Sequence, residues 1–457
     1  MNKTHFNSDD VNKVFKSKLI DKNYSGASLD SRLTKKNNIF FAINGKKNNG
    51  HNFIKNAYKN GASLAIVERL QKNIGIPQIK VDDTHKALIR FAKYYRKNLN
   101  AKILAITGSV GKTSSKDALA KILSSNYKIF FSRESYNNHF GVPLEILNMP
   151  LNSEIGIFEL GMNHKKEISK LTKILNPETV CILNVNFVHG GNFKSVKDIA
   201  MAKAEITNSS KDLKTVIINY DSNFYNLIKK TANKDYKKSI ISFGLNKGAD
   251  IFLFKKKTSN SLINLSVLTN DNKKICYKIL LNHEYLIPNT LALIACLKAL
   301  NVNLSYIKKY NENLLPQGRG NLIKLKYSNM NFKLVDHSYN ASPTSFISTM
   351  DAFNNYKSKK KIFILGEMFE LGEKKEFYHK KIINHLDTLD GQFFFLIGAQ
   401  YKKIMNKCKK NNYIFLKSVD ELLKCFKKYI SNGSIVYIKG SNGTNLHKFV
   451  RHLKELN

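Results

Sequence analysis

The segment Ile103-Leu104-Ala105-Ile106-Thr107-Gly108-Ser109-Val110-Gly111-Lys112-Thr113 joins a short apolar run to a glycine turn with a Gly-Lys-Thr ending. Apolar residues at helical spacing follow between positions 115 and 125. A glycine turn between a strand and a helix presents backbone N–H groups to phosphate oxygens. We therefore predict a nucleoside-triphosphate site formed by Thr107, Gly108, Ser109, Val110, Gly111, Lys112 and Thr113.

Within this loop, Lys112 is expected to lie against the terminal phosphates, and the Thr113 hydroxyl is expected to face magnesium. The interval between Gly108 and Gly111 is shorter than in the generic P-loop, G-x-x-x-x-G-K-[ST]. The alternative is a chance glycine turn, which the strand before it and the Gly-Lys-Thr ending disfavour.

Strand-like and helix-like runs alternate on both sides of this loop, which predicts an α/β fold. We predict a small N-terminal α/β domain (1–100) and a central P-loop-type ATPase domain with a mostly parallel sheet (101–315). A C-terminal Rossmann-like α/β domain (316–457) is expected to follow a glycine- and proline-containing linker at 311–320. Within the central domain, the short alternating runs of 239–281 predict an antiparallel insert.

Composition narrows the class of protein. The chain has 457 residues, of which 42% are hydrophobic and 24% charged, as is usual for a folded globular protein. The five cysteines are scattered and form no C-x-x-C, which is typical of reduced, cytosolic proteins. Apolar runs are too short to cross a bilayer, and positions 1–20 contain no continuous apolar block. We expect a cytoplasmic protein without membrane insertion.

The chain is strongly basic, with 75 Lys and Arg against 34 Asp and Glu, a formal net charge of +41. One interpretation is a protein that binds nucleic acid or a membrane surface. The other is the lysine-, asparagine- and isoleucine-rich drift of an AT-rich genome. The lysines occur in dispersed pairs and triplets, for example 359–361, without the interleaved aromatic residues that single-stranded nucleic acid requires. This pattern favours drift, and no nucleic-acid partner is expected.

Further sequence motifs accompany the phosphate loop and are found through most of the chain. In the centre they are Asn137-Asn138-His139-Phe140-Gly141-Val142-Pro143-Leu144, Glu159-Leu160-Gly161-Met162-Asn163-His164, Asn184-Val185 leading to His189, and Ala202-Lys203-Ala204-Glu205-Ile206. Towards the ends they are Asp30-Ser31-Arg32, Asp336-His337-Ser338-Tyr339-Asn340-Ala341-Ser342-Pro343 and Leu365-Gly366-Glu367-Met368-Phe369-Glu370-Leu371-Gly372. Together with the shortened loop, this order of motifs resembles the Mur ligase family.

The resemblance implies an ATP-dependent amide-bond ligase that works through an acyl phosphate. The motifs are most similar to those of the member that adds D-alanyl-D-alanine to UDP-N-acetylmuramoyl-tripeptide, the last cytoplasmic peptide addition in peptidoglycan precursor synthesis. ATP, two Mg²⁺ ions, these two substrates and a monomeric chain are expected. Three alternatives stay open: another Mur-type ligase that adds a diamino acid or glutamate, a P-loop ATPase that binds nucleic acid, and an inactive scaffold.

The resemblance also implies roles for individual residues. The catalytic set is Lys112, Lys203, His189 and Arg319, and the metal set is Thr113, Glu159, His189 and Lys203. Lys203 is expected to carry a carbamate, which converts a cation into an oxygen donor for magnesium. Beyond the loop, the nucleotide is expected to meet Asn137, Asn289, Arg319, Asp336 and Asn340, whereas Asp30, Ser31 and Arg32 would hold the UDP-sugar.

Each of these residues also has a simpler interpretation. Glu159 could be an exposed strand end, His189 a surface histidine, Lys203 a solvated helix residue and Arg319 a surface turn residue. Residues 30–32 could form a local turn with an internal ion pair. Departures from the family pattern fall at Leu286, His337 and Asn442, where an asparagine, an acid and an arginine are more usual.

Overall fold

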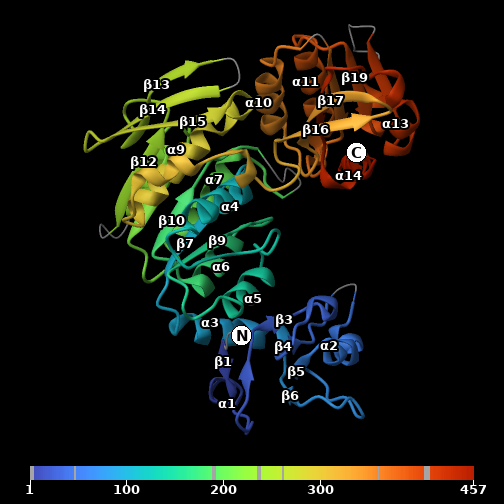
Figure 1. The fold of residues 1–457 in the computed structure, drawn as a ribbon. Coiled ribbons are helices and arrows are strands. Elements are labelled where there is room, and N and C mark those ends of the chain that lie inside the picture. The colour runs from blue at the N-terminus through green and yellow to red at the C-terminus, as the bar shows by residue number, and fades with distance from the viewer. Residues whose placement is uncertain are drawn as a thin grey trace.

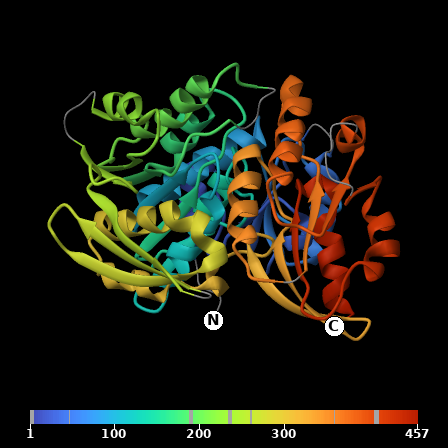
Figure 2. The same cartoon turned by 90° about the horizontal axis from the view of Figure 1, so that it is seen from above.

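The chain forms units that follow one another from one end of the molecule to the other. The computed structural model describes residues 5–45, 48–187, 192–233, 238–259, 262–358, 360–405 and 412–456. In Figure 1 the N-terminal unit lies at the bottom, the central sheet runs from the middle to the upper left, and the C-terminal unit lies at the upper right. Figure 2, seen from above, shows the C-terminal unit beside the central one.

The N-terminal unit contains a small parallel sheet of order β3-β4-β5-β6 and a two-stranded antiparallel ribbon, β1-β2. The strands are β1 (Phe6–Asn7), β2 (Asn23–Tyr24), β3 (Ala27–Ser28), β4 (Asn38–Phe41), β5 (Ala62–Val67) and β6 (Gln78–Lys80). The helices are α1 (Ser8–Phe15), α2 (Ile54–Lys59) and α3 (Thr84–Lys97).

The central sheet has the order β15-β14-β13-β12-β11-β10-β7-β9-β8. Its strands are β7 (Lys102–Thr107), β8 (Ile129–Phe131), β9 (Ile155–Glu159), β10 (Thr179–Ile182), β11 (Thr215–Asn219), β12 (Ser239–Gly244), β13 (Ile251–Thr258), β14 (Leu262–Thr269) and β15 (Lys274–Leu280). Its helices are α4 (Lys112–Leu123), α5 (Gly141–Leu147), α6 (Glu167–Leu175), α7 (Val196–Ala204), α8 (Tyr225–Ala232) and α9 (Ile287–Ala299).

The predicted antiparallel insert is only partly right. β12 pairs parallel with β11, and β13 pairs parallel with β12, so the sheet stays parallel as far as β13. Only β14 and β15 run antiparallel, as a meander that follows β13. Alternating burial along β14 identifies one covered face, and this alternation is the pattern that suggested antiparallel strands.

The C-terminal sheet has the order β16-β17-β21-β18-β19-β20 and is parallel except for β16. Its strands are β16 (Asn321–Tyr327), β17 (Met330–His337), β18 (Lys361–Gly366), β19 (Phe393–Ile397), β20 (Tyr413–Leu416) and β21 (Ile435–Lys439). Its helices are α10 (Pro343–Asn354), α11 (Lys375–Leu386), α12 (Ala399–Lys403), α13 (Val419–Cys425) and α14 (Leu446–Glu455).

The hydrophobic cores show which units depend on one another. One cluster runs from Phe6 in the N-terminal unit to Ala232 in the central unit, so these two units share a core across residue 100. The two clusters of the C-terminal sheet, in contrast, contain no described residue before Leu322. Among the described residues, the C-terminal unit therefore has hydrophobic clusters of its own and shares none with the rest of the chain.

The predicted α/β class with parallel sheets is confirmed. Helix α4 differs from the prediction in the residue at which it begins. The helix begins at Lys112, earlier than the apolar spacing indicated, because Gly111 has φ 84° and turns the chain directly into the helix.

Helix α3 was not predicted, although Asp83 caps it and Leu88, Phe91 and Tyr95 follow at helical spacing. No helix in the described ranges has the length and apolar character that a membrane crossing requires.

Arg96 of α3 fastens the N-terminal unit to the central one. The side chain is buried and donates from Nε to the carbonyl of Leu175 at 2.8 Å and from Nη2 to the carbonyl of Asn176 at 3.1 Å. It also donates from Nη1 to the carbonyl of Leu99 and forms an ion pair with Glu178 at 3.2 Å. A buried guanidinium thus satisfies the carbonyls at the end of α6.

We expect Arg96→Met to lower the free energy of unfolding by about 3 kcal/mol, because it leaves the buried carbonyls without their donor and removes the ion pair with Glu178. Denaturant unfolding followed by circular dichroism measures this loss. Lys97→Met, at the exposed neighbouring position, is the matched control and should stay within about 0.5 kcal/mol of wild type. Equal stability of the two variants would contradict the fastening role.

Candidate active site

The candidate site lies where the carboxyl ends of two parallel sheets face each other. In the central sheet the adjacent strands β9, β7 and β10 end at Glu159, at Thr107 and shortly before Asn184. In the C-terminal sheet β17 and β21 end at His337 and Lys439. Residues that follow these strands line a shared cavity of about 1160 Å³. Ligands of open parallel sheets bind at this edge.

The phosphate loop is braced by two asparagines. Asn184 accepts from the backbone N–H of Val110 and donates to its carbonyl, both at 2.9 Å. The backbone of Asn186 exchanges two hydrogen bonds with the Ser109 hydroxyl, also at 2.9 Å. Gly111 packs so closely that an added Cβ would lie 2.2 Å from Nδ2 of Asn289. The loop therefore holds its shape before any ligand arrives.

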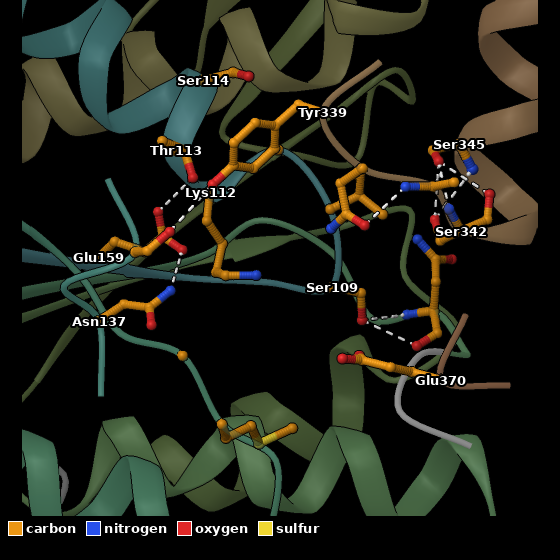
Figure 3. Close-up of a pocket in the computed structure, with 18 of the residues that line it drawn as sticks. Ser109, Lys112, Thr113, Ser114, Asn137, Glu159, Tyr339, Ser342, Ser345 and Glu370 are labelled. Carbon is orange, nitrogen blue, oxygen red and sulfur yellow. Dashed lines mark hydrogen bonds between the residues drawn. The ribbon is translucent and has the colours of Figure 1, made fainter. Parts of the chain in front are cut away.

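Glu159 is the centre of the polar network beside the loop. It is 4% exposed and accepts from the Thr113 hydroxyl at 2.6 Å and from Nδ2 of Asn137 at 2.7 Å (Figure 3). Burial opposes its ionisation, but the Lys112 charge and these two hydrogen bonds together hold its pKa below the usual range. The interpretation of Glu159 as an exposed strand end is wrong.

Two lysines adjoin this carboxylate. Lys112 lines the cavity and donates from Nζ to the Gly108 carbonyl at 2.9 Å, and burial lowers its pKa. Lys203 is 3% exposed, and burial, followed by the charge of Lys112, lowers its pKa well below the ordinary value. The interpretation of Lys203 as a solvated helix residue is therefore wrong.

Arg319 reaches the cavity from the linker. Its guanidinium forms an ion pair with Glu134 at 3.0 Å and lies over the Tyr339 ring at 4.3 Å. The Tyr339 hydroxyl hydrogen-bonds Ser135 at 3.1 Å, so both side chains connect the C-terminal unit to the loop after β8. Figure 3 shows the Tyr339 ring reaching toward Lys112 and Thr113. Arg319 is therefore not a surface turn residue.

The other predicted residues divide into those at the cavity and those away from it. Asn137, Asn289 and Asn340 line the cavity. Asp336 is buried, accepts from the Ser338 N–H at 3.0 Å and is not among the lining residues. His189 lies outside the described residues.

Asp30, Ser31 and Arg32 lie in the N-terminal unit and do not line this cavity. They form a turn in which Arg32 pairs with Asp30 at 2.7 Å, as the simpler interpretation expected. A role for this turn in binding the UDP-sugar stays a prediction.

Sequence reasoning did not identify several residues of the cavity wall: Asn186, Glu134, Ser135, Tyr285 and Lys439. Asn186 follows strand β10 as Asn184 does, and this spacing was an available signal. Lys439 is 4% exposed and donates to the Asn340 carbonyl at 3.0 Å, while burial and then Arg319 lower its pKa to about 7. The departures Leu286, His337 and Asn442 also line the cavity.

The arrangement suits the transfer of a phosphoryl group between two anions. Lys112, Lys170, Arg319 and Lys439 bring positive charge to one cavity beside backbone N–H groups of the loop. Among the described residues no cluster of three or more His, Cys, Asp or Glu side chains could hold a metal ion. Thr113 and Glu159 are therefore the predicted metal residues whose mutual contact the structure shows. The fold and the site define the class: a P-loop enzyme acting on a nucleoside triphosphate.

Comparison with known families agrees with this class. The model of the Mur ligase middle domain matches residues 106–297, and that of the Mur ligase glutamate ligase domain matches 318–442. The model of the Mur ligase family catalytic domain matches 23–96. The chain belongs to the Mur ligase family of ATP-dependent ligases.

Individual relatives extend over nearly the whole chain. UDP-N-acetylmuramoyl-tripeptide–D-alanyl-D-alanine ligase of Rickettsia prowazekii is 32% identical over 94% of this chain and 95% of its own. The protein of the same name from Buchnera aphidicola subsp. Baizongia pistaciae is 33% identical over 93% and 91%. The crystal structure of MurF from Acinetobacter baumannii superposes with a TM-score of 0.84 at 26% identity, over 98% and 99% of the two chains.

We expect Lys112→Ala to abolish ATP-dependent turnover while the far-ultraviolet circular dichroism spectrum stays unchanged, because the substitution removes a cation beside the phosphate loop. Phosphate release at saturating substrate measures the effect. Lys121→Ala, at an exposed position of the same helix, is the control and should keep wild-type turnover. Normal turnover in folded Lys112→Ala would overturn the assignment of the loop.

Proposed function

We propose that this enzyme joins D-alanyl-D-alanine to UDP-N-acetylmuramoyl-tripeptide and forms ADP and phosphate. The observation that carries the proposal is the similarity to relatives that are named for this activity and align over more than nine-tenths of the chain. The cavity adds support, because the phosphate loop and the cations of the C-terminal unit face one space. The reaction belongs to peptidoglycan precursor synthesis and is assigned to the cytoplasm.

The reaction requires two anions to meet. A carboxylate oxygen of the tripeptide attacks the terminal phosphorus of ATP, the bond to ADP breaks, and an acyl phosphate forms. The amine of the dipeptide then attacks the acyl carbon, phosphate leaves, and the amine loses a proton. We assign to Lys112 and Arg319 the offsetting of negative charge on the phosphoryl group, since both line the cavity and a guanidinium can stabilise spreading phosphoryl charge.

We assign the parts of the reaction to successive segments of the chain. Residues 1–100 hold the UDP-sugar end, with Asp30, Ser31 and Arg32 at a turn of this unit. Residues 101–315 hold the triphosphate, and residues 316–457 complete the site with Arg319 and Asn340. A monomer suffices, because one chain supplies both walls of the cavity. The lysines are dispersed over all three segments and are not concentrated in any one of them. No nucleic-acid partner is therefore proposed.

The residues beside the loop fit magnesium only if Lys203 does not carry a positive charge. Thr113 and Glu159 offer oxygen atoms, but the ammonium groups of Lys112 and Lys203 lie close to the same carboxylate. A buried ammonium would repel a divalent cation, whereas a carbamate on Lys203 would supply oxygen donors. We therefore propose that Lys203 is carbamylated and that Thr113, Glu159, Lys203 and His189 hold Mg²⁺. The metal, when bound, neutralises charge on the phosphates.

The experiment that tests the proposed function is a phosphate-release assay with ATP and UDP-N-acetylmuramoyl-tripeptide. We expect turnover to require D-alanyl-D-alanine and the peptide product to contain both residues, as mass spectrometry would show. Separate reactions with D-glutamate, with a diamino acid and with single-stranded nucleic acid should stay at background. Turnover with one of these and none with the dipeptide would replace the proposal with the corresponding alternative.

Lys203→Ala should have very low activity, because the proposed metal site loses an oxygen donor. Added acetate or propionate should restore part of it by occupying the vacated space. Lys197→Ala, at an exposed position of the same helix, is the control and should change stability by roughly 0.5 kcal/mol or less without lowering turnover. Wild-type turnover in Lys203→Ala would refute the carbamate.

A further inference from the structure

The turn that carries Arg319 has an unusual backbone. Gly318 and Gly320, on either side of Arg319, have φ of 74° and 107°, a region that favours glycine. The turn is joined to the end of β17, since the N–H of Gly320 donates to the Asp336 carbonyl at 2.7 Å and the N–H of Tyr339 donates to the Gly318 carbonyl at 3.3 Å. These bonds leave the carbonyls of Arg319 and Gly320 for other partners.

Both carbonyls are taken by the central unit. The 3₁₀ helix Leu281–Leu286 precedes α9, and Nε2 of its His283 lies 3.1 Å from the Gly320 carbonyl oxygen. The Tyr285 hydroxyl of the same helix donates to the Arg319 carbonyl at 3.3 Å. His283 is 1% exposed, so water does not compete for its bond. We call His283 and Tyr285 the linker clamp.

The protonation state of His283 follows from its surroundings. A carbonyl only accepts, so Nε2 must carry the hydrogen. Nδ1 is buried and has no hydrogen-bond partner among the described residues. Burial lowers the pKa of His283 to about 4, although the bond to Gly320 opposes this shift. The imidazole is therefore a neutral donor whose single N–H is directed at the linker.

The turn is closely packed at Gly320. A Cβ added to Gly320 would lie 2.4 Å from the Tyr285 hydroxyl and 3.1 Å from Cε1 of His337. The rings of Tyr285 and His337 meet edge to face with centroids 5.6 Å apart, so the clamp also contacts the C-terminal unit. The backbone of Arg319 is thus enclosed by both units before its side chain reaches the cavity.

We propose that His283 and Tyr285 are positioning residues, which fix the Arg319 backbone so that its guanidinium stands at the phosphoryl site. This inference rests on the proposed function, because Arg319 is assigned there to the transferred phosphoryl group. The guanidinium has only the Glu134 ion pair and the Tyr339 ring to orient it, and its Nε has no partner among the described residues. Misplacement of a reacting group by about 1 Å costs as much as 100-fold in rate.

The test is a double-mutant cycle in the full-length enzyme. His283→Met removes the donor, His283→Gln keeps an N–H at a similar reach, and Tyr285→Phe removes only the hydroxyl. We expect His283→Met to lower kcat by roughly tenfold to 100-fold with little change in the KM for ATP. Glutamine should restore most of that loss. His452→Met, at an exposed position of α14, is the control and should behave as wild type.

In an Arg319→Ala background the same substitution of His283 should cause no further loss, because the residue through which it acts is gone. An equal fold-loss in both backgrounds would overturn the proposal and indicate a general structural role. Hydrogen exchange of the 315–322 segment provides a readout independent of substrates. Faster exchange in His283→Met is expected, and unchanged exchange would also overturn the proposal. Inactivity of wild type with D-alanyl-D-alanine would instead contradict the proposed function.

Discussion

The buried Glu159 carboxylate offsets the charges of Lys112, at the cavity wall, and of Lys203, which is buried behind it. Charges in such surroundings interact strongly, so their number and distance must be controlled. The central sheet provides this control, because β7 and β9 are neighbours and end at the same edge. Hydrogen bonds from Thr113 and Asn137 then fix the carboxylate in place. The phosphate loop, the proposed metal residues and the proposed carbamate all depend on this arrangement.

The C-terminal unit completes the site without sharing a core with the rest of the chain. Its own hydrophobic clusters fill both faces of its sheet. The contacts that join it to the central unit include the Arg319–Glu134 ion pair, the Tyr339–Ser135 hydrogen bond and the linker clamp. The Phe187 and Tyr378 rings stack at 5.4 Å on another part of this interface. Polar and aromatic contacts of this kind can be broken and remade, which suits a site that must admit three substrates.

The departures from the family pattern now have a location. Leu286, His337 and Asn442 all line the cavity, so each change alters the wall that substrates meet. His337 is 4% exposed and contacts Tyr285 of the linker clamp, which gives it a packing role where an acid is more usual. Lys439 brings a buried amine, whose pKa is lowered to about 7, to the same wall as Asn442. Near neutral pH this wall therefore carries the charge of Arg319 and only part of a charge at Lys439.

The sequence by itself determined the phosphate loop, the α/β alternation and the positions of the motifs, because these signals are local. A glycine turn, a run of apolar residues or a capped helix is encoded within a few neighbouring positions. Only the tertiary structure decided the burial of Lys203, the removal of Asp336 from the cavity wall and the partners of Arg319. Glu134 is separated from Arg319 by 185 positions, and His283 from Gly320 by 37. Such contacts arise because the carboxyl ends of the strands of two sheets face each other, and no local pattern encodes that packing.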